Sequence, residues 1–375
     1  MKIDIITLHR VRNYGSVLQA LATQNILRDM GCETELIDYY PERYKSVGLL
    51  KRLKNKSRRL AKNPILLLAA RMIISISYIK KKIVFDKFLK NYLKLTPVTY
   101  RSEEELINNV PVADAYCTGS DQVWNSYWNE GVDKPLYLSF VPAGCYKFSY
   151  ASSIGNSDLT QEEANTVKPY FEDYKHITVR ENTGIKIMND MGIDGVEQMI
   201  DPTLLFPAQY WNKYTSDKYK NQKYVVTYNL HHDGRIDKYA NVLAKENGCK
   251  VYNISYNLHD IVRKGTLKWC PETEKYLGLI RDAQYVVTDS FHATVFSLSF
   301  GKKFLVIYPE QASSRLRSIL ELLGLQNRGF DDMPPLEAIK GDIDFNDVHS
   351  KLEAERKRAR SYFEMVLGEI GGCHE

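Results

Sequence analysis

The sequence predicts an α/β protein with two Rossmann-like, doubly wound domains that face a cleft. Strand-like and helix-like segments alternate in two successive series, as in parallel sheets covered by helices. Many of these strands end in Gly, Ser, Asp or Arg, the residue types expected at the ligand-binding edge of such a sheet. The length of 375 residues also favours two domains, because a single hydrophobic core stops growing at about 250–300 residues.

Residues 1–205 are expected to form the N-terminal domain. A β-rich run at 3–6, apolar residues at helical spacing over 17–26 and a second run at 33–40 predict a βαβ opening. Further strands are expected at 113–118, 146–151, 176–179 and 196–200.

Residues 206–348 repeat this alternation and are expected to form the C-terminal domain. Its predicted strands begin at Tyr224, Lys250, Tyr285 and Phe304, and its helices are expected at 236–246, 291–300 and 315–323. The charged stretch 352–367 predicts a last helix, within a segment 349–375 that packs back on the body.

The charge is distributed unevenly along the chain. The whole chain carries +5, yet residues 45–94 hold 15 basic residues and one acid, so this segment carries +14 and the other 325 residues carry −9. Its order of basic, apolar and basic stretches predicts a helical insertion that lies on an anionic membrane surface. A solvated helical hairpin whose apolar face packs on the body is the alternative. Nucleic acid is not expected as a partner, because no interleaved aromatic residues or binding motif accompany the charge.

Several other classes of protein are disfavoured. The first ten residues form a strand pattern and not a signal peptide, and the apolar run 65–79 contains Arg71 and is too short to span a bilayer. The six cysteines have no metal-like spacing, and no dinucleotide, P-loop or metallo-hydrolase motif is present. A cytoplasmic protein is therefore expected, with peripheral attachment to the inner face of the plasma membrane through residues 45–94.

Two strand ends of the first domain carry candidate binding residues. After the first strand, Asn13, Gly15 and Ser16 combine a helix cap with a close backbone approach, although an ordinary capping loop would look the same. After the strand 113–118 come Gly119, Ser120, Asp121 and Trp124. Asp121 could accept a proton from a sugar hydroxyl while Trp124 packs on a sugar ring; alternatively, Asp121 is a cap and Trp124 belongs to the core.

Two further strand ends carry candidate ligands for an anion. Arg180 follows the strand 176–179, where a guanidinium needs either an anionic ligand or an internal partner such as Glu181. Asp289, Ser290 and His292 stand at the start of a helix, where anions bind, and His292 is a candidate general acid. Arg315 is the best candidate among the nearby basic residues to reach the cleft.

These segments, taken together, resemble the successive motifs of the polysaccharide pyruvyltransferase family, the bacterial enzymes of capsule and exopolysaccharide biosynthesis. The motifs appear in the family's order between residues 3 and 325, and the two most specific are 119–124 (Gly-Ser-Asp-Gln-Val-Trp) and 288–292 (Thr-Asp-Ser-Phe-His). The others are at 13–16, 149–155, 179–181 and 201–203.

The resemblance implies a GT-B-like pair of domains, an acceptor side in the first and a donor side in the second. It also implies transfer of the pyruvyl group of phosphoenolpyruvate to a sugar as a cyclic ketal, with release of phosphate. Arg180 and His292 match positions expected to hold the carboxylate and phosphate of the donor. Other branches of the family have Arg-Leu-His where this chain has 290–292, so the Arg is missing and Arg315 is the expected substitute.

The mechanism expected from these residues has His292 as the acid and Asp121 as the base, with Arg180 and the helix that starts at Ser290 holding the anion. No metal or other cofactor is expected, and the expected acceptor is a lipid-linked oligosaccharide. Two alternatives remain open: a GT-B glycosyltransferase that uses a nucleotide-sugar, and a non-enzymatic adaptor that docks on the membrane.

Overall fold

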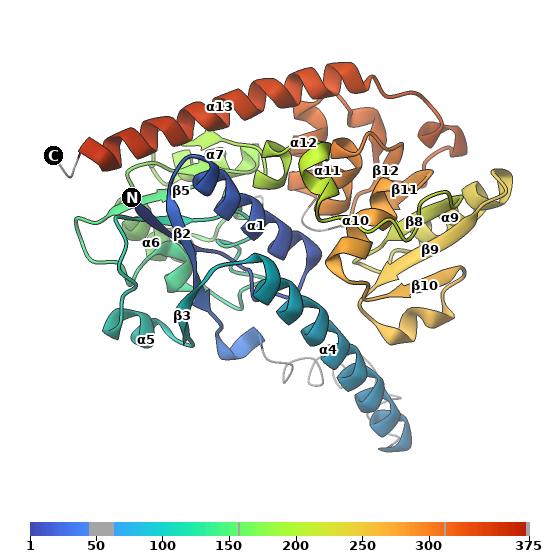
Figure 1. Ribbon diagram of the computed structural model, residues 1–375, viewed down its shortest axis with the longest axis horizontal. Helices are drawn as coiled ribbons and strands as arrows, with labels where there is room; N and C mark the ends of the chain where they lie inside the picture. Colours follow the sequence, from blue (N-terminus) through green and yellow to red (C-terminus); the bar gives the residue numbers. More distant parts are fainter. Residues whose placement is uncertain (45–63, 157, 311–312, 373–375) are drawn as a thin grey trace.

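Two parallel β-sheets, each covered by helices, form the body of the protein in the computed structural model, which describes residues 1–44, 64–156, 158–310 and 313–372 (Figure 1). The fold class predicted from the sequence, a pair of Rossmann-like domains, is confirmed. The central strands of each sheet are buried and strongly apolar, as expected when helices lie on both faces of a sheet, whereas strands at the edges are less buried.

The N-terminal sheet has the strand order β3-β2-β1-β4-β5, and every neighbouring pair is parallel. Its strands are β1 (Lys2–Ile6), β2 (Glu33–Tyr39), β3 (Leu95–Tyr100), β4 (Ala115–Thr118) and β5 (Tyr146–Ser149). Two short parallel strands, β6 (Thr178–Val179) and β7 (Glu197–Gln198), follow at the β5 edge. The helices of this part are α1 (Tyr14–Asp29), α4 (Pro64–Tyr92), α5 (Glu103–Asn108), α6 (Gln161–Phe171) and α7 (Asn182–Asp190).

The C-terminal sheet has the order β10-β9-β8-β11-β12-β13 and is also parallel throughout. Its strands are β8 (Tyr224–Tyr228), β9 (Lys250–Ser255), β10 (Thr266–Trp269), β11 (Tyr285–Thr288), β12 (Phe304–Ile307) and β13 (Gly329–Phe330). The helices α8 (Ala208–Asn212), α9 (Gly234–Glu246), α10 (Thr273–Arg281), α11 (Phe291–Ser299) and α12 (Ser314–Leu322) accompany them.

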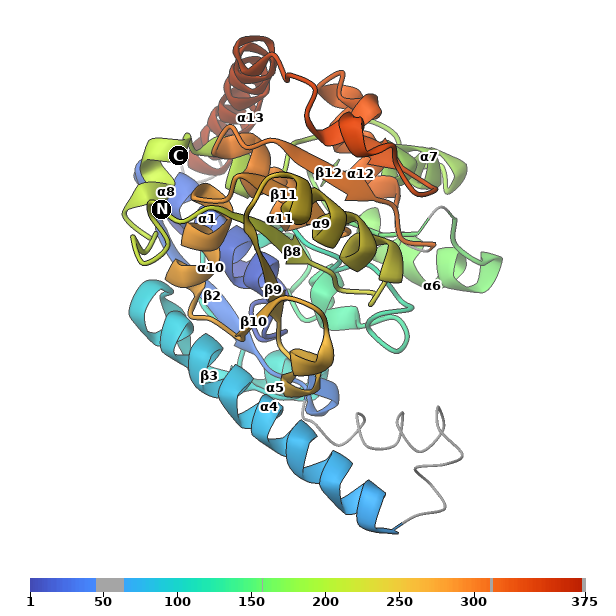
Figure 2. The same cartoon turned by 90° about the vertical axis from the view of Figure 1, so that its right-hand side faces the viewer.

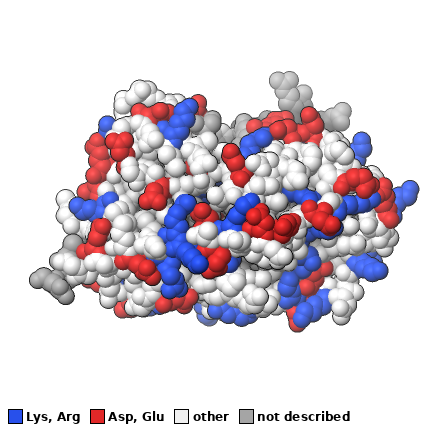
Figure 3. Space-filling model, turned by 90° about the horizontal axis from the view of Figure 1, so that it is seen from above, with Lys and Arg blue, Asp and Glu red and all other residues white. Residues whose placement is uncertain are grey.

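The last helix, α13 (Phe345–Gly372), crosses from the C-terminal sheet to the N-terminal one along the upper edge of the molecule in Figure 1. Its second half packs on the N-terminal sheet: Tyr362 donates a hydrogen bond to the carbonyl of Ser149 (2.8 Å), and the ring of Phe363 lies 4.5 Å from that of Tyr150. Figure 3, which views the molecule from above, shows basic and acidic side chains interspersed on this face.

An aromatic cluster joins the two sheets next to the site described below. Tyr14 of α1 stacks on Tyr276 of α10 with a centroid distance of 4.1 Å, and it also contacts Tyr228 and Tyr256. The Tyr14 hydroxyl donates to the carbonyl of Pro271 (2.5 Å). These buried residues belong to one continuous core that includes both sheets, so the site lies on a packed interface.

Helix α4 forms most of the described part of the basic segment 45–94. Residues 45–63 of that segment lie outside the described residues. Its C-terminal half packs on the body through Val84, Phe85, Phe88 and Leu89, whereas its N-terminal half projects away from the body in both Figure 1 and Figure 2. Within the described residues, no helix combines the length and the apolar character needed to cross a membrane.

Candidate active site

The candidate site lies where the winding of both sheets reverses. In the N-terminal sheet this point falls between β1 and β4, and in the C-terminal sheet between β8 and β11. Ligands of doubly wound sheets bind outside the carboxyl ends of the strands at such points. The segments that follow β1, β4, β8 and β11 all contribute to one cavity of about 430 Å³, which is large enough for a small organic ligand.

His292 lies in the first turn of α11 and lines this cavity. Its ring packs on Gly15 of α1 so closely that a methyl group at Gly15 would overlap the imidazole. Gly15 itself is held by the cap of its helix, since Asn13 Oδ1 accepts a hydrogen bond from its amide (2.9 Å). The close approach at Gly15 is therefore made by a side chain of the other domain and not by a ligand, and Gly15 does not line the cavity.

Asp121 follows β4 and has a backbone φ of 77°, a left-handed conformation that is uncommon for a residue other than glycine. Ser16 donates to its Oδ2 (2.5 Å), and Arg180 Nη2 lies 3.7 Å from its Oδ1. Burial alone would raise the pKa of Asp121, but Arg180 and His292 outweigh it and lower the pKa. The carboxyl group is therefore ionised at neutral pH.

Arg180 is buried beneath the cavity and does not line it. Its Nη1 donates to Asp201 Oδ2 (2.8 Å), and its guanidinium lies 4.6 Å from the ring centre of Phe291, which stands between it and the cavity. Asp201 also faces His292, with 3.5 Å between Oδ2 and Nε2. Burial raises the pKa of Asp201, but His292 and Arg180 hold it well below its usual range.

Arg315 of α12 lines the cavity, with its guanidinium 5.9 Å from the ring centre of Phe291. Burial and the neighbouring charge of Arg180 lower the pKa of Arg315 to about 10, although Glu181, Asp121 and Asp201 oppose this shift. A guanidinium with so low a pKa is incompletely compensated by the acids around it.

Four buried side-chain nitrogen atoms of these three basic residues have no hydrogen-bond partner in the described part of the chain, although two of them lie within ion-pair distance of Asp121 or Asp201. They are Arg180 Nε, Arg180 Nη2, His292 Nε2 and Arg315 Nε. Buried polar groups are nearly always paired, so a cluster of unpaired donors at one cavity needs an explanation. An anion bound in the cavity would supply acceptors for His292 and Arg315, which line it.

The other predicted residues surround this centre. Ser290 caps α11 and lines the cavity, while both oxygens of Asp289 accept hydrogen bonds from the loop after β8. Gly119 packs on Thr7, and Ser120 donates to the carbonyl of Ala151 (2.8 Å), so both lie beneath the site and not in its wall.

Trp124 is placed in the core, which corrects the expectation that its ring packs on a sugar. It is 1% exposed, its Nε1 donates to the carbonyl of Leu136 (3.1 Å), and its ring contacts Phe171 (4.8 Å). The same loop presents two other aromatic rings to solvent, Tyr127 (68% exposed) and Trp128 (49% exposed).

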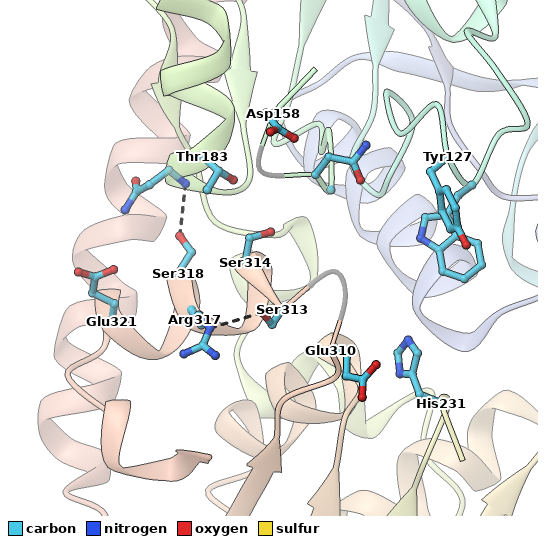
Figure 4. A pocket seen from close by; sticks show the side chains of 14 residues that line it. Tyr127, Asp158, Thr183, His231, Glu310, Ser313, Ser314, Arg317, Ser318 and Glu321 are labelled. Carbon is cyan, nitrogen blue, oxygen red and sulfur yellow. Dashed lines mark hydrogen bonds between the residues drawn. The ribbon is translucent and has the colours of Figure 1, made fainter. Parts of the chain in front are cut away.

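Tyr127 and Trp128 line a second cavity of about 820 Å³ (Figure 4). Its other walls come from the start of α7 and from the residues around the start of α12. Trp128 and His231 line both cavities, so the second cavity adjoins the first.

Sequence reasoning missed Asp201 and His231. Asp201 was recognised within a family motif but not as a neighbour of Arg180 and His292. His231 follows the buried strand β8, and the rule that ligands bind at strand ends could have found it. Within the described residues, no group of three or more His, Cys, Asp or Glu side chains is arranged to hold a metal ion.

Solved structures with the same architecture include a glycosyltransferase and UDP-N-acetylglucosamine 2-epimerases. AviGT4, a glycosyltransferase involved in avilamycin A biosynthesis, is 12% identical and covers 99% of this chain and 98% of its own, with a TM-score of 0.51. UDP-N-acetylglucosamine 2-epimerase from Rickettsia bellii is 12% identical (97% and 96% covered, TM-score 0.51), and S. aureus MnaA in complex with UDP is 10% identical (98% and 97% covered, TM-score 0.51). The fold and the position of the site thus define a two-domain protein of the GT-B class.

The sequence identifies the family of this protein within that fold. The family model of polysaccharide pyruvyl transferases matches residues 13–311, which is most of the chain. The protein belongs to the polysaccharide pyruvyl transferase family and is a transferase. A search of curated proteins found no significant match.

Proposed function

We propose that the protein transfers the pyruvyl group of phosphoenolpyruvate to a sugar of a surface polysaccharide precursor, as a cyclic ketal, and releases phosphate. The observation that carries this proposal is a cluster of three basic side chains at one cavity. His292 and Arg315 line the cavity, Arg180 lies beneath it, and each has a buried side-chain nitrogen without a hydrogen-bond partner in the described part of the chain. Phosphoenolpyruvate offers a carboxylate and a phosphate on three carbons. Both groups are strong acceptors for such donors.

Arg315 and the N-terminus of α11 hold the two anionic groups of the donor in this proposal. Arg315 lines the cavity, and the helix contributes free N–H groups and its positive end next to Ser290. Arg180 acts from beneath Phe291: it adds positive charge and fixes Asp121 and Asp201. No metal ion takes part in this scheme.

His292 donates a proton to the methylene carbon of the donor, which leaves positive charge on the neighbouring carbon. A sugar hydroxyl adds there, and a second hydroxyl then displaces phosphate and closes the ketal. The contacts with Gly15 and Asp201 fix the ring for this transfer.

Asp121 is a poor candidate for the base that the sequence suggested. Its pKa is lowered, and its Oδ2 already accepts the hydrogen bond from Ser16. A base works best when its pKa is near the working pH. We therefore assign Asp121 to holding Ser16 and Arg180 in place.

The test is a reaction of the purified protein with phosphoenolpyruvate and a panel of p-nitrophenyl hexosides with free hydroxyl pairs. The proposal expects phosphate release that requires both substrates. Calorimetry with UDP and with phosphoenolpyruvate separates it from the alternative: binding of the nucleotide alone would favour a glycosyltransferase. An adaptor without activity would bind neither.

We propose further that α4 attaches the protein to an anionic membrane, where a lipid-linked acceptor resides. One face of the helix exposes an apolar stripe, Leu68, Met72, Ile76, Ile79 and Ile83, each between 47% and 59% exposed. With about 100° per residue, Arg71 and Lys82 flank this stripe on one side and Lys80 and Lys87 on the other. Such an arrangement is typical of helices that lie in the surface of anionic bilayers.

Vesicle sedimentation tests this attachment. The protein should sediment with vesicles that contain phosphatidylglycerol, less with pure phosphatidylcholine, and less at high salt. Ile76→Asp combined with Ile79→Asp should abolish sedimentation, whereas Val112→Asp, at a site that is 85% exposed outside α4, should not. Equal sedimentation of the two variants would contradict the attachment.

A further inference from the structure

A histidine–aspartate pair stands between the two cavities and has no role in the scheme above. His231 follows β8 and Asp289 follows β11, and these strands are parallel neighbours, so their carboxyl ends lie side by side. His231 Nδ1 lies 2.8 Å from Asp289 Oδ2. A carboxylate can only accept a hydrogen bond, so Nδ1 carries the proton and Nε2 is left as a free acceptor.

Asp289 fixes the loop as well as the ring. Its Oδ1 accepts the amide of Leu230 (2.8 Å), and its Oδ2 accepts the amide of His231 (2.9 Å). Asp289 is buried, whereas the side chain of His231 is 39% exposed. The pair therefore has a rigid inner member and an outer member that can meet a substrate.

The position of His231 is specific, since among the residues that the structure describes only His231 and Trp128 line both cavities. In Figure 4 the imidazole of His231 points into the larger cavity toward Tyr127 of the other domain. The smaller cavity, called the inner cavity here, is lined by His292 and Arg315, the residues proposed to act on the donor. The larger cavity is called the outer cavity. His231 thus stands at the boundary between the cavity of the donor and the larger cavity.

We propose that His231 is the general base that deprotonates the acceptor hydroxyl, that Asp289 is its positioning residue, and that the outer cavity binds the acceptor sugar. This inference rests on the proposed function. The exposed rings of Tyr127 and Trp128, which meet edge to face with centroids 5.7 Å apart, provide the flat apolar surface that sugars pack on. Asp158, Asn182 and Thr183 line the same cavity and offer polar partners for hydroxyl groups.

The bonds and protons balance in this scheme. His292 gives a proton to the methylene carbon; the first acceptor O–H bond breaks, its proton goes to His231 Nε2, and the oxygen bonds to the central carbon of the donor. The second hydroxyl then bonds to the same carbon, the bond from that carbon to the phosphate oxygen breaks, and phosphate leaves with the second proton. His231 then releases its extra proton to solvent and His292 takes up a proton from solvent, which restores both residues.

The matched variants are His231→Gln and His232→Asn. His232 belongs to the same loop, is 48% exposed and lines neither cavity; its φ of 58° is compatible with Asn. Phosphate release with phosphoenolpyruvate and the p-nitrophenyl hexoside panel gives kcat, and calorimetry gives the Kd of phosphoenolpyruvate. We expect His231→Gln to lower kcat by about 10²–10⁴ with that Kd unchanged within about twofold, and His232→Asn to match the wild type.

Two further readouts separate a base from a merely structural residue. His231→Gly should regain activity when imidazole is added. The decline of kcat/KM at low pH in the wild type, where a base becomes protonated, should disappear in His231→Gln. The other charged groups that line the two cavities and shape this profile are Arg43, Asp121, Glu130, Asp158, Asp289, His292, Glu310, Arg315, Arg317 and Glu321, and Asp233 lies on the same loop.

The outcomes are distinct. A His231→Gln protein with near wild-type kcat and an unchanged pH profile would overturn the inference and leave the proposed function standing. If His231→Gln weakened phosphoenolpyruvate binding as much as it lowered kcat, the inference would also be overturned, because His231 would then act on the donor. A wild-type protein that neither binds phosphoenolpyruvate nor releases phosphate would overturn both proposals.

Discussion

The two groups of basic side chains in this protein, those around the inner cavity and those on α4, differ in burial and in partners. Arg180 and His292 are at most 7% exposed, and they stand among carboxylates that leave several of their donors unpaired. Lys82 and Lys87 of α4 are more than half exposed and form surface ion pairs with Asp86 and Glu272. Buried, incompletely paired charges select a small anion, whereas exposed charges act through an extended surface potential.

The largest effect is expected at His292 and at the glycine beneath it. His292→Ala and Gly15→Ala should each lower the transfer rate by about 10²–10⁴, because the first removes the acid and the second forces the ring out of its position. Phosphate release from phosphoenolpyruvate measures both. Gly234→Ala is the control, since it also stands in a first helical turn but has open space around its Cα. Full activity of Gly15→Ala would show that the position of His292 does not matter.

Arg315 should control the affinity for the donor. Arg315→Met should weaken binding of phosphoenolpyruvate about 10–100-fold, because hydrogen bonds to charged groups contribute about 1.5–3 kcal/mol. Calorimetry checks this, with Arg317→Met as the control, since Arg317 is exposed and pairs with Asp331. An unchanged Kd in Arg315→Met would show that Arg315 does not bind the anion, and would contradict the role given to the basic residues at the inner cavity.

Binding of phosphoenolpyruvate should also weaken at high pH. Burial and Arg180 lower the pKa of Arg315 to about 10, so its positive charge is lost as the pH rises through that value. Above it, the Kd should rise by up to about tenfold per pH unit. In Arg315→Lys the rise should begin at a lower pH, because the ordinary pKa of lysine is about 10.4 and burial lowers it further. Identical profiles for the two proteins would rule out residue 315 as the titrating group.

The smallest effects are expected on α4, where no single charge dominates. Arg71→Ser and Lys90→Ser should each weaken partition onto phosphatidylglycerol vesicles about fivefold, since each basic residue near the surface contributes about 1 kcal/mol. The Kd of phosphoenolpyruvate should stay unchanged in both variants, and Arg315→Met should leave vesicle partition unchanged. A change of the Kd in an α4 variant, or of vesicle partition in Arg315→Met, would mean that the two groups of charges do not act independently.

The sequence predicted the fold well because its strands are short, buried apolar runs with clear polar ends. The edge strand β3 was missed, since it contains Pro97 and only two of its six residues are buried. Hydrophobic periodicity carries little information about such a strand.

Within the site, residues that stand at strand ends can be selected from the sequence, whereas contacts between distant segments cannot. Asn13, Ser16, Asp121 and His292, all selected in this way, line one cavity. The pairing of His231 with Asp289 spans 58 residues and exists only because β8 and β11 are neighbours. Trp124 and Trp128 lie in one irregular loop, and no pattern in the sequence tells which of them faces solvent.

The most direct test of the central claim is incubation of the purified protein with phosphoenolpyruvate and the hexoside panel, followed by phosphorus NMR and mass spectrometry. The account predicts that inorganic phosphate appears only when both substrates are present, and that one acceptor gains the mass of pyruvate less water. It also predicts that His292→Ala abolishes both signals. Transfer of a sugar from a nucleotide-sugar to the same acceptors, with phosphoenolpyruvate left intact, would contradict it.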